Sequence, residues 1–365
     1  MKNQHITLVL TEECNLRCSY CYEKNKTKKS LEYEFIIETL QEILNKDDQY
    51  EKCIIEFFGG EPFLKFELIK NVVNYFKNAT FKKAIHLFAV TNGTLVHGPI
   101  KQFLIENRDI LSCGLSFDGN EYSQNLNRDN SFSMVDLDFF AKLYQDQWVK
   151  MTISKETIGQ LFDSIKFLES KGFIVHCNLA YGLDWADERL QEQLSNQLDL
   201  LIQYYLENPS QKRCSFLDGD ITFSYQKKSE IDKWCGVGSD SMIVIGADKK
   251  RYPCQVLMPT SGEEIKVMED IPEKVPISFY PKECQNCMLI QRCPTCYSSN
   301  FINNGNPYKK DKGFCECQKI IFKKKALLNA LLWQKGEIKM DKQEEKLFLS
   351  CIKNVLENNF EFRES

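Results

Sequence analysis

The chain has 365 residues, of which 43% are hydrophobic and 27% are charged, and its formal net charge is −4. This length leaves room for about two domains, and the composition is that of an ordinary globular protein. The small negative charge gives no case for nucleic acid or an anionic membrane surface as a partner. No apolar run approaches the roughly 20 residues that span a bilayer, and the N-terminus lacks the apolar core of a signal peptide. We therefore expect a cytoplasmic protein that binds neither nucleic acid nor a membrane.

The chain up to residue 206 alternates between strand-like and helix-like segments. We expect strands over residues 6–10, 53–58, 85–91, 112–117, 150–153 and 174–181. Helical patterns cover residues 31–44, 66–77, 100–107, 135–145, 157–171 and 187–206. Alternation of this kind predicts an α/β fold with a parallel sheet. Six units make most of a barrel, so we expect a partial (β/α)6 TIM-like barrel with its chemistry at the carboxyl ends of the strands.

Three cysteines follow the first strand at once. Cys14, Cys18 and Cys21 have the spacing C-x3-C-x2-C within one short segment. Three thiolates on one loop can hold three irons of a [4Fe–4S] cube and leave the fourth iron open to a small molecule. A zinc site would need a fourth ligand nearby, and no His or Cys follows within a short span. The spacing therefore favours a [4Fe–4S] cluster over zinc or unrelated buried thiols.

The segment Cys-Asn-Leu-Arg-Cys-Ser-Tyr-Cys-Tyr, residues 14–22, resembles the signature of the radical S-adenosylmethionine (SAM) superfamily. In that family the open iron binds the amino and carboxylate groups of SAM. Reductive cleavage then gives a 5′-deoxyadenosyl radical that abstracts a hydrogen atom. The resemblance implies SAM as a cofactor and an external electron donor of the flavodoxin or ferredoxin type. It also places Tyr20, beside Cys21, against the adenine ring.

Short polar motifs close the next strands. The paired glycines of Gly59-Gly60-Glu61-Pro62 would let a ligand approach the backbone, and Glu61 offers a carboxylate to an ammonium group. This segment resembles the family's Gly-Gly-Glu-Pro, which holds the amino group of SAM. By the same resemblance, we expect further cofactor contacts at the ends of the later strands, at Thr91, Asn92, Ser116, Asp118 and Ser154. For Arg128, a place beside the SAM carboxylate and an exposed loop position both stay open.

Eight more cysteines lie between residues 235 and 317, and the remaining five stand alone. Isolated cysteines are commonly small buried hydrophobes, and disulfides are disfavoured in the cytosol. Two short strands, 242–245 and 251–253, flank a Gly-containing turn and predict a hairpin. The later run C-x2-C-x5-C-x2-C has too short a central spacing for a zinc ribbon. The clustering favours one or two further Fe–S clusters.

This arrangement resembles the SPASM extension of radical SAM enzymes that modify peptides, which carries two auxiliary [4Fe–4S] clusters. Carried over by position, it assigns the first auxiliary cluster to Cys235, Cys254 and Cys296. It assigns the second to Cys284, Cys287, Cys293 and Cys315, with Cys317 as a competitor of Cys315. The run departs from the family's usual C-x3-C ending, and Ser241 stands where a cysteine is often found. The first auxiliary cluster therefore has an open iron unless Cys317 supplies a fourth ligand.

These expectations divide the chain into a barrel over residues 1–210, a SPASM domain over 211–320 and a helical tail over 321–365. Residues 208–233 are polar and are expected to form an irregular linker. The tail contains amphipathic helical patterns over 320–333 and 342–358. Amphipathic helices of this length usually pack on their own protein, and a docking face for a partner is the alternative.

The resemblance implies an oxidoreductase that modifies a ribosomally made peptide or protein by hydrogen abstraction and oxidative crosslinking, through a thioether or a carbon–carbon bond. One alternative is an anaerobic sulfatase-maturing enzyme, which oxidises Ser or Cys to formylglycine. That group typically has an Asp base directly after the hairpin cysteine, where this chain has Gln255, and an amide cannot take the proton. Two others are a peptide epimerase and an Fe–S redox protein without SAM turnover, which would leave residues 59–62 without a purpose.

No general base can be named from the sequence. Glu56 and Asp184 are ionisable residues near predicted strand ends, and structural roles are the simpler interpretation for both. The chain starts on its first strand, so it offers no room for an N-terminal leader-binding domain. If the substrate has a leader, we expect a separate leader-binding protein or the barrel and tail surfaces to recognise it.

Overall fold

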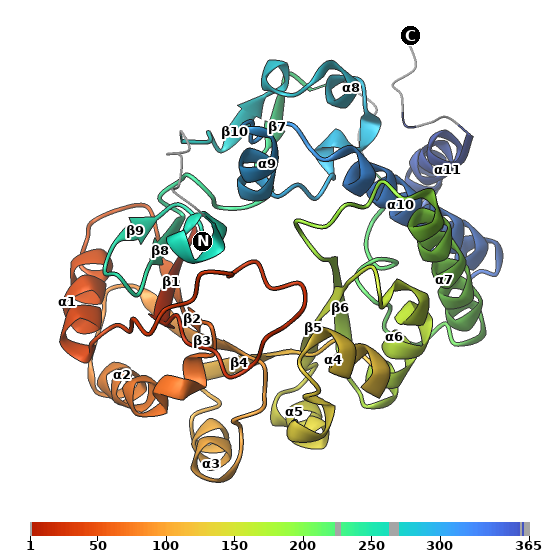
Figure 1. The fold of residues 1–365 in the computed structure, drawn as a ribbon. Coiled ribbons are helices and arrows are strands. Elements are labelled where there is room, and N and C mark those ends of the chain that lie inside the picture. Colours follow the sequence, from red (N-terminus) through yellow and green to blue (C-terminus); the bar gives the residue numbers. More distant parts are fainter. Residues whose placement is uncertain (1, 223–227, 263–269, 358–359, 361–365) are drawn as a thin grey trace. The chain divides into compact units, whose positions relative to one another are not determined.

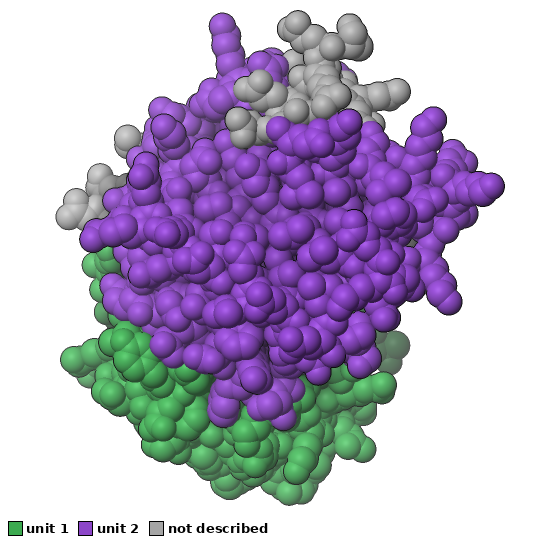
Figure 2. Space-filling view, turned by 90° about the vertical axis from the view of Figure 1, so that its right-hand side faces the viewer, with its two compact units in different colours: residues 1–150, 171–173, 235–272 green, residues 151–170, 174–234, 273–365 purple. Residues whose placement is uncertain are grey.

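The structure is a computed structural model that describes residues 2–222, 228–262, 270–357 and 360. It divides into two compact units, coloured separately in Figure 2, and neither is one continuous stretch of chain. Unit 1 contains residues 1–150, 171–173 and 235–272, and unit 2 contains residues 151–170, 174–234 and 273–365. The division predicted from sequence, at residues 210 and 320, stays a prediction.

All six strands predicted for the alternating region are present. They are β1 (Asn3–Thr11), β2 (Lys52–Gly59), β3 (Ala84–Thr91), β4 (Leu111–Ser116), β5 (Trp148–Ile153) and β6 (Ile174–Leu179). Strands β1 to β5 pair in parallel in sequential order, and the full strand order is β6-β5-β4-β3-β2-β1-β8-β9. Their apolar, β-branched sequences suit a parallel sheet that is buried on its faces. This order confirms the predicted α/β fold of the partial-barrel type.

Five helices connect the strands of unit 1. They are α1 (Tyr33–Leu44), α2 (Phe66–Asn78), α3 (Gly98–Glu106), α4 (Glu121–Asn127) and α5 (Leu137–Leu143). Helices α1 to α3 lie along one side of strands β1 to β4 (Figure 1). The sequence did not predict α4, because its residues are mostly polar and lack an apolar period. Its start is fixed instead by Asn120, whose side chain accepts a hydrogen bond from Ser123 N at 3.0 Å.

The predicted hairpin is confirmed and joins the sheet of unit 1. Its strands are β8 (Met242–Ile245) and β9 (Arg251–Tyr252), which pair antiparallel. Strand β8 also pairs in parallel with β1, with His5 opposite Met242. Val9 and Val244 share a buried cluster with Ala247 and Met258. The hairpin therefore extends the same sheet beyond β1.

Unit 2 holds the remaining helices and a small second sheet. The helices are α6 (Leu161–Ser170), α7 (Glu188–Glu207), α8 (Lys282–Gln285), α9 (Tyr297–Asn304), α10 (Lys312–Gln334) and α11 (Lys342–Glu357). Strand β7 (Glu230–Asp232) pairs antiparallel with β10 (Lys274–Pro276). The segment expected to be an irregular linker therefore contributes a short strand.

The tail helices pack within unit 2, as their amphipathic patterns predict. Phe322 of α10 and Phe348, Ile352 and Val355 of α11 belong to one buried cluster. Helix α10 begins at Lys312, earlier than predicted, and so includes two of the cysteines. Over the parts of the chain that the structure describes, no helix has both the length and the hydrophobicity needed to cross a membrane.

Candidate functional site

The three cysteines of the first motif lie on the cysteine loop, residues 12–32, which joins β1 to α1 (Figure 1). Cys14, Cys18 and Cys21 are each partly buried. The pKa of Cys18 is raised to about 11, mainly by burial and in smaller part by the charges of Asp118 and the other two thiols, while the Arg128 charge opposes the rise. Lys26 of the same loop is hydrogen-bonded to Cys21, and its charge opposes the rise at Cys14. The positive charge of cluster irons would stabilise the ionised form of these three thiols.

Among the described residues, no group of three or more His, Cys, Asp or Glu side chains is arranged to hold a single metal ion. Cluster cysteines bind different irons, so their sulfur atoms spread around the cube and do not converge on one point.

The paired glycines at the end of β2 hold the cysteine loop close to the sheet. Gly59 has a φ of +146°, and a Cβ there would lie 2.2 Å from the Thr11 carbonyl oxygen. A Cβ at Gly60 would lie 2.3 Å from the Glu13 carbonyl oxygen and 2.9 Å from Cys14 Cβ. The Gly60 N–H donates to the Thr11 carbonyl at 3.0 Å. The glycines thus make room for the loop itself, and their contact with SAM stays a prediction.

The Glu61 carboxylate lies buried where β2 and β3 end, and it accepts three hydrogen bonds. Oε1 accepts from Thr91 Oγ1 at 2.7 Å and from Phe63 N at 3.1 Å, while Oε2 accepts from Asn92 N at 2.8 Å. Pro62 follows as the first residue of a 3-10 turn that Glu61 caps. Burial raises the pKa of Glu61 to about 7 despite these donors. A nearby ammonium group would therefore stabilise its ionised form.

The structure thus brings together residues that the sequence placed on different strand ends. Thr91 and Asn92 both bond Glu61 directly. The Asn92 amide also donates to Asn15 of the cysteine loop at 3.0 Å. Ser116 is partly buried at the end of β4 in the same unit. These contacts link the three-cysteine loop to the predicted SAM-binding strand ends.

Asp118 and Arg128 form a buried ion pair beyond the end of β4. Arg128 Nε lies 3.0 Å from Asp118 Oδ2, and both side chains are almost fully buried. The same oxygen accepts from the Tyr20 hydroxyl at 2.7 Å and from Asn127 Nδ2 at 3.2 Å. The Arg128 guanidinium also lies over the Tyr20 ring, 5.6 Å from its centroid. The exposed position left open for Arg128 is therefore wrong, and Tyr20 has a hydrogen-bonded role whether or not it contacts adenine.

The weaker candidates have local partners. Ser154 lies in unit 2, where its N–H donates to Thr157 Oγ1 at 3.1 Å in a tight turn. Glu56 is buried on β2, accepts from Thr7 Oγ1 at 2.9 Å and lies 2.9 Å from His5 Nε2. Asp184 is exposed and accepts from Ala186 N at 2.9 Å. These contacts fit the structural roles expected for Glu56 and Asp184.

A second thiol group lies wholly within unit 2, at the four-cysteine pocket. Cys284, Cys287, Cys293 and Cys315 all line one cavity of about 290 Å³. The pKa of Cys284 is raised to about 12, mainly by burial and in smaller part by the charges of the other three cysteines. The four thiols are therefore close enough to repel one another as thiolates. The positive charge of cluster irons would let all four ionise together.

Cationic and aromatic side chains surround this pocket. Lys310 Nζ lies 2.7 Å from Cys293 Sγ. Burial raises the pKa of Cys315, and the charges of Lys310 and Lys319 oppose that rise. The Tyr280 and Tyr297 hydroxyls lie 3.0 Å apart and line the same cavity. The lysines suit a cluster with four thiolate ligands, which carries net negative charge. No sequence pattern pointed to Lys310, which is 17 residues from Cys293. Lys319 lies one helical turn from Cys315 on α10 and was not singled out either.

The remaining predicted ligands are placed differently. Cys317 is fully buried on α10 and does not line the pocket; its charged neighbours are Asp311 and Glu316. Cys235 and Cys254 belong to unit 1, whereas Cys296 belongs to unit 2, so the first auxiliary set stays a prediction. The five isolated cysteines are all buried, as expected: Cys53, Cys113, Cys177, Cys214 and Cys351.

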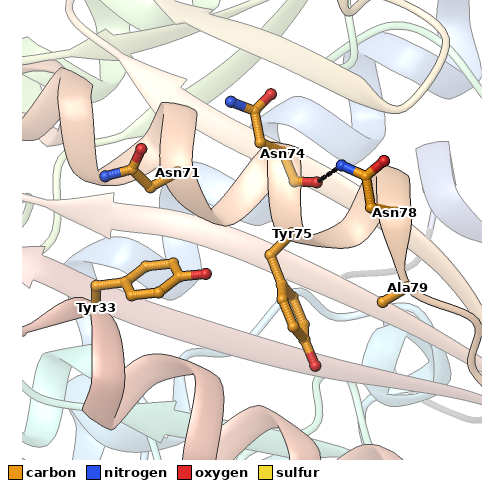
Figure 3. A pocket seen from close by; sticks show the side chains of 6 residues that line it. All are labelled: Tyr33, Asn71, Asn74, Tyr75, Asn78 and Ala79. Carbon is orange, nitrogen blue, oxygen red and sulfur yellow. Dashed lines mark hydrogen bonds between the residues drawn. The ribbon is translucent and has the colours of Figure 1, made fainter.

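A polar groove of about 480 Å³ lies beside α1 and α2 in unit 1 (Figure 3). It is lined by Tyr33, Asn71, Asn74, Tyr75, Asn78 and Ala79. The three asparagines share one face of α2 through their spacing of three and four residues. The lining offers hydrogen bonds but no group that titrates near neutral pH. We assign it no part in the chemistry.

A family model described as a 4Fe-4S single cluster domain matches residues 5–133, which contain the cysteine loop. The chain is 23% identical over 361 residues to the radical SAM cyclopropyl synthase TigE of Paramaledivibacter caminithermalis, covering 87% of this chain and 73% of that protein. It is 24% identical over 355 residues to the cysteine-type anaerobic sulfatase-maturating enzyme of Clostridium novyi, covering 86% and 92%. An uncharacterized protein of Methanocaldococcus jannaschii is 28% identical over 245 residues, covering 60% and 81%.

Solved structures share the fold. Native anSMEcpe with bound AdoMet and the Cp18Cys peptide superposes with a TM-score of 0.66 at 20% identity, covering 92% of this chain and all of that chain (100%). Streptococcus suis SuiB bound to its precursor peptide SuiA superposes with a TM-score of 0.52 at 16% identity, covering 86% and 76%. The chain is therefore similar to radical SAM maturases, matches a 4Fe-4S single cluster domain over residues 5–133, and has the fold of the SPASM-domain enzymes anSMEcpe and SuiB. These likenesses support a [4Fe–4S] cluster and SAM as its cofactors.

Proposed function

We propose that the chain is an oxidoreductase of the radical SAM/SPASM type that modifies a ribosomally made peptide by forming a thioether or carbon–carbon crosslink. The observation that carries this proposal is the four-cysteine pocket of unit 2. A radical SAM loop alone would serve many reactions. Crosslinking removes two hydrogen atoms from the substrate, one as a hydrogen atom and one as a proton plus an electron. That electron needs an acceptor, and a second cluster would provide one.

The peptide substrate is proposed from the relatives. SuiB is described with its precursor peptide SuiA, and anSMEcpe with a peptide named Cp18Cys. TigE is named a cyclopropyl synthase, which is also a bond-forming activity. An external flavodoxin- or ferredoxin-type donor and, where the substrate has a leader, a separate leader-binding protein complete the proposed partners.

The residues of unit 1 have distinct roles in this proposal. Cys14, Cys18 and Cys21 hold the first cluster, and the Glu61 carboxylate accepts the ammonium group of SAM. Lone-pair capacity on Glu61 Oε2, which accepts one hydrogen bond from Asn92, supports that role. When bound, SAM and the clusters supply hydrogen-atom abstraction and electron transfer. The chain positions these groups and keeps the loop against the strand ends through Gly59 and Gly60.

Formylglycine formation is the second candidate. The fold of anSMEcpe and the Clostridium novyi relative favour it. Against it stands Gln255, which directly follows Cys254 and whose Oε1 lies 3.7 Å from that cysteine's Sγ. An amide does not accept a proton near neutral pH, so this position offers no base. We therefore place crosslinking first.

The test is an anaerobic reaction of the full chain with SAM, a reductant and the short peptide encoded beside its gene, followed by mass spectrometry. A peptide lighter by two hydrogen atoms, with 5′-deoxyadenosine formed, would support crosslinking. Deuterium uptake from solvent without loss of mass would support epimerisation, and an aldehyde in a sulfatase-derived peptide would support formylglycine formation. If no 5′-deoxyadenosine forms under strong reductant, the result would favour an Fe–S redox protein without SAM turnover.

A further inference from the structure

We propose that the charged ammonium group of Lys310, hydrogen-bonded to the sulfur of Cys293, raises the reduction potential of the cluster in the four-cysteine pocket. This inference rests on the proposed function, which places a cluster in that pocket. It adds a residue that is not a ligand and that lies outside the cysteine pattern. Lys310 would act on the cluster through Cys293, so it is a positioning residue.

The first support is the fixed position of the Lys310 ammonium group. Its Nζ lies 2.7 Å from Cys293 Sγ and 2.9 Å from the Pro294 carbonyl oxygen. The side chain also passes the Phe314 ring, whose centroid is 5.6 Å from Nζ. Two acceptors on consecutive residues and one aromatic face therefore hold the ammonium beside the sulfur. An untethered surface lysine would spend its hydrogen bonds on water.

The second support is that the charge of Lys310 is not cancelled by a carboxylate. In the described part of the chain, no Asp or Glu oxygen lies within ion-pair distance of Lys310. Its neighbour Asp311 accepts a hydrogen bond from Phe314 N at 2.9 Å and so caps α10. Lys319, which lines the same pocket, differs because its ammonium pairs with Glu316 at 3.0 Å. Lys310 therefore brings a full positive charge to a ligand sulfur.

The third support is the place of Lys310 between two groups of predicted ligands. Besides the four-cysteine pocket, it lines a small neighbouring cavity together with Cys296. A hydrogen bond and a positive charge at a ligand sulfur stabilise the reduced cluster, which is the more negative state. The cluster in this pocket thus becomes a better acceptor for the electron that oxidative crosslinking releases.

The experiment is a redox titration of the full chain, followed by electron paramagnetic resonance. Only the cluster of interest should titrate, so the predicted ligands of the other two clusters are replaced by Ala: Cys14, Cys18, Cys21, Cys235, Cys254 and Cys296. Into this background we introduce Lys310→Met and, as the matched control, Lys319→Met. At the potential where the parent cluster is half reduced, we expect Lys310→Met to lower the ratio of reduced to oxidised cluster about tenfold. This corresponds to about 59 mV for a one-electron couple.

The control separates a hydrogen-bonded charge from charge in general. Lys319→Met should shift the midpoint much less, because its charge is already paired with Glu316. Equal shifts in the two variants, or an unchanged midpoint in Lys310→Met, would overturn the proposal. If Lys310→Met cannot hold the cluster, Lys310→Gln keeps a neutral donor at the same place. A midpoint of Lys310→Gln equal to that of the parent would then overturn it.

Failure of the proposed function would look different. If the parent background itself binds no iron and gives no cluster spectrum, the four-cysteine pocket is not a cluster site. The proposal for Lys310 then falls with it, before any lysine variant is measured. A parent that holds a cluster with an unshifted Lys310→Met midpoint refutes the role of Lys310 alone.

Discussion

The cysteine loop of unit 1 and the four-cysteine pocket of unit 2 assemble their thiols in opposite ways. On the loop, Cys14, Cys18 and Cys21 lie within one short segment that β1 and α1 hold at its two ends. Around the pocket, Cys284 lies on α8 and Cys315 on α10, with the long segment between them contributing the rest. The first set is local in sequence and the second depends on how distant helices pack.

The charges around the two sets differ in the same way. Lys26, which is hydrogen-bonded to Cys21, comes from the cysteine loop itself. Lys310, which bonds Cys293, comes from the segment before α10. The lysine beside the loop cysteines therefore comes from the same short segment as the cysteines. The lysine beside Cys293 comes from a different segment of unit 2. We therefore expect substitution of the loop cysteines to abolish cluster binding on the loop. Substitutions around the pocket should have effects that depend on which residue is replaced.

Replacing all three loop cysteines, Cys14, Cys18 and Cys21, with Ala gives the largest expected effect. Without thiolates the loop cannot hold a cluster, so formation of 5′-deoxyadenosine should be lost. The loss should exceed the roughly 10–100-fold that removal of an outer partner of a metal site costs. Iron content and 5′-deoxyadenosine are the measurements. Turnover that survives in the triple variant would refute the assignment of the loop.

The pocket should distinguish Cys315 from Cys317. Cys315→Ser removes a thiol that lines the pocket, so iron bound in unit 2 should fall by about one cluster per chain. Cys317→Ser should retain the iron, because Cys317 is buried away from the pocket. Iron analysis and Mössbauer spectra of both variants make the comparison. Equal losses in the two variants would mean that the pocket geometry does not select the ligand.

Gly60→Ala tests how tightly the loop lies against the sheet. The new Cβ would meet the Glu13 carbonyl oxygen at 2.3 Å, so the cysteine loop must move away from β2. We expect the free energy of unfolding to fall by about 1–3 kcal/mol, together with lower iron content. Gly159→Ala is the matched control, because nothing lies within 4 Å of its Cβ and the change should stay within about 0.5 kcal/mol. Denaturant unfolding and iron analysis measure both; equal stabilities would show that the loop tolerates the shift.

From the raised pKa of Glu61 we expect both stability and SAM affinity to change gradually with pH. Its pKa is raised by burial from 4.5 to about 7, so the folded chain holds this proton more tightly than the unfolded chain. The stability that this proton provides is therefore present below the unfolded value and is lost as the pH rises through about 7. If SAM pairs its ammonium with the ionised carboxylate, its affinity should rise about tenfold per pH unit up to about pH 7.

Calorimetric titration of SAM between about pH 5.5 and pH 7.5 measures this dependence. Glu61→Gln keeps the hydrogen-bonding shape but cannot ionise, so its SAM affinity should be weaker and independent of pH. An affinity for the unmodified chain that does not change with pH would exclude Glu61 as the ammonium partner.

Much of the fold could be predicted from the sequence because its signals are local. The β-branched runs marked all six strands of the alternating region, and the Gly-containing turn marked the β8–β9 hairpin. Helix α4 and strands β7 and β10 were missed. Helix α4 depends on its Asn120 cap, and β7 and β10 are three-residue strands that exist through pairing with each other. Such elements draw their stability from partners that a local pattern does not contain.

The candidate site likewise contains residues that local sequence signals predicted and residues that they did not. The loop cysteines were recognised from their spacing and the Gly59–Pro62 segment from its resemblance to a family motif. Thr91 and Asn92 were expected at the same edge of the sheet, and the structure adds that both donate hydrogen bonds to Glu61. The buried ion pair of Arg128 with Asp118 could not be predicted, because a charged residue in a loop does not show from sequence whether it has an ion-pair partner. Nor did any pattern point to Lys310.

Three features could be read from the sequence alone: three thiols on one loop, a carboxylate after paired glycines, and a second group of cysteines. Residue type and short spacing carry this information, because neighbours along the chain are also neighbours in space. Only the tertiary structure decided that Cys315 and not Cys317 faces the pocket, that Gly59 and Gly60 hold the loop, and that Lys310 touches Cys293. Those outcomes depend on contacts between distant segments, which are fixed by packing and burial of the whole unit.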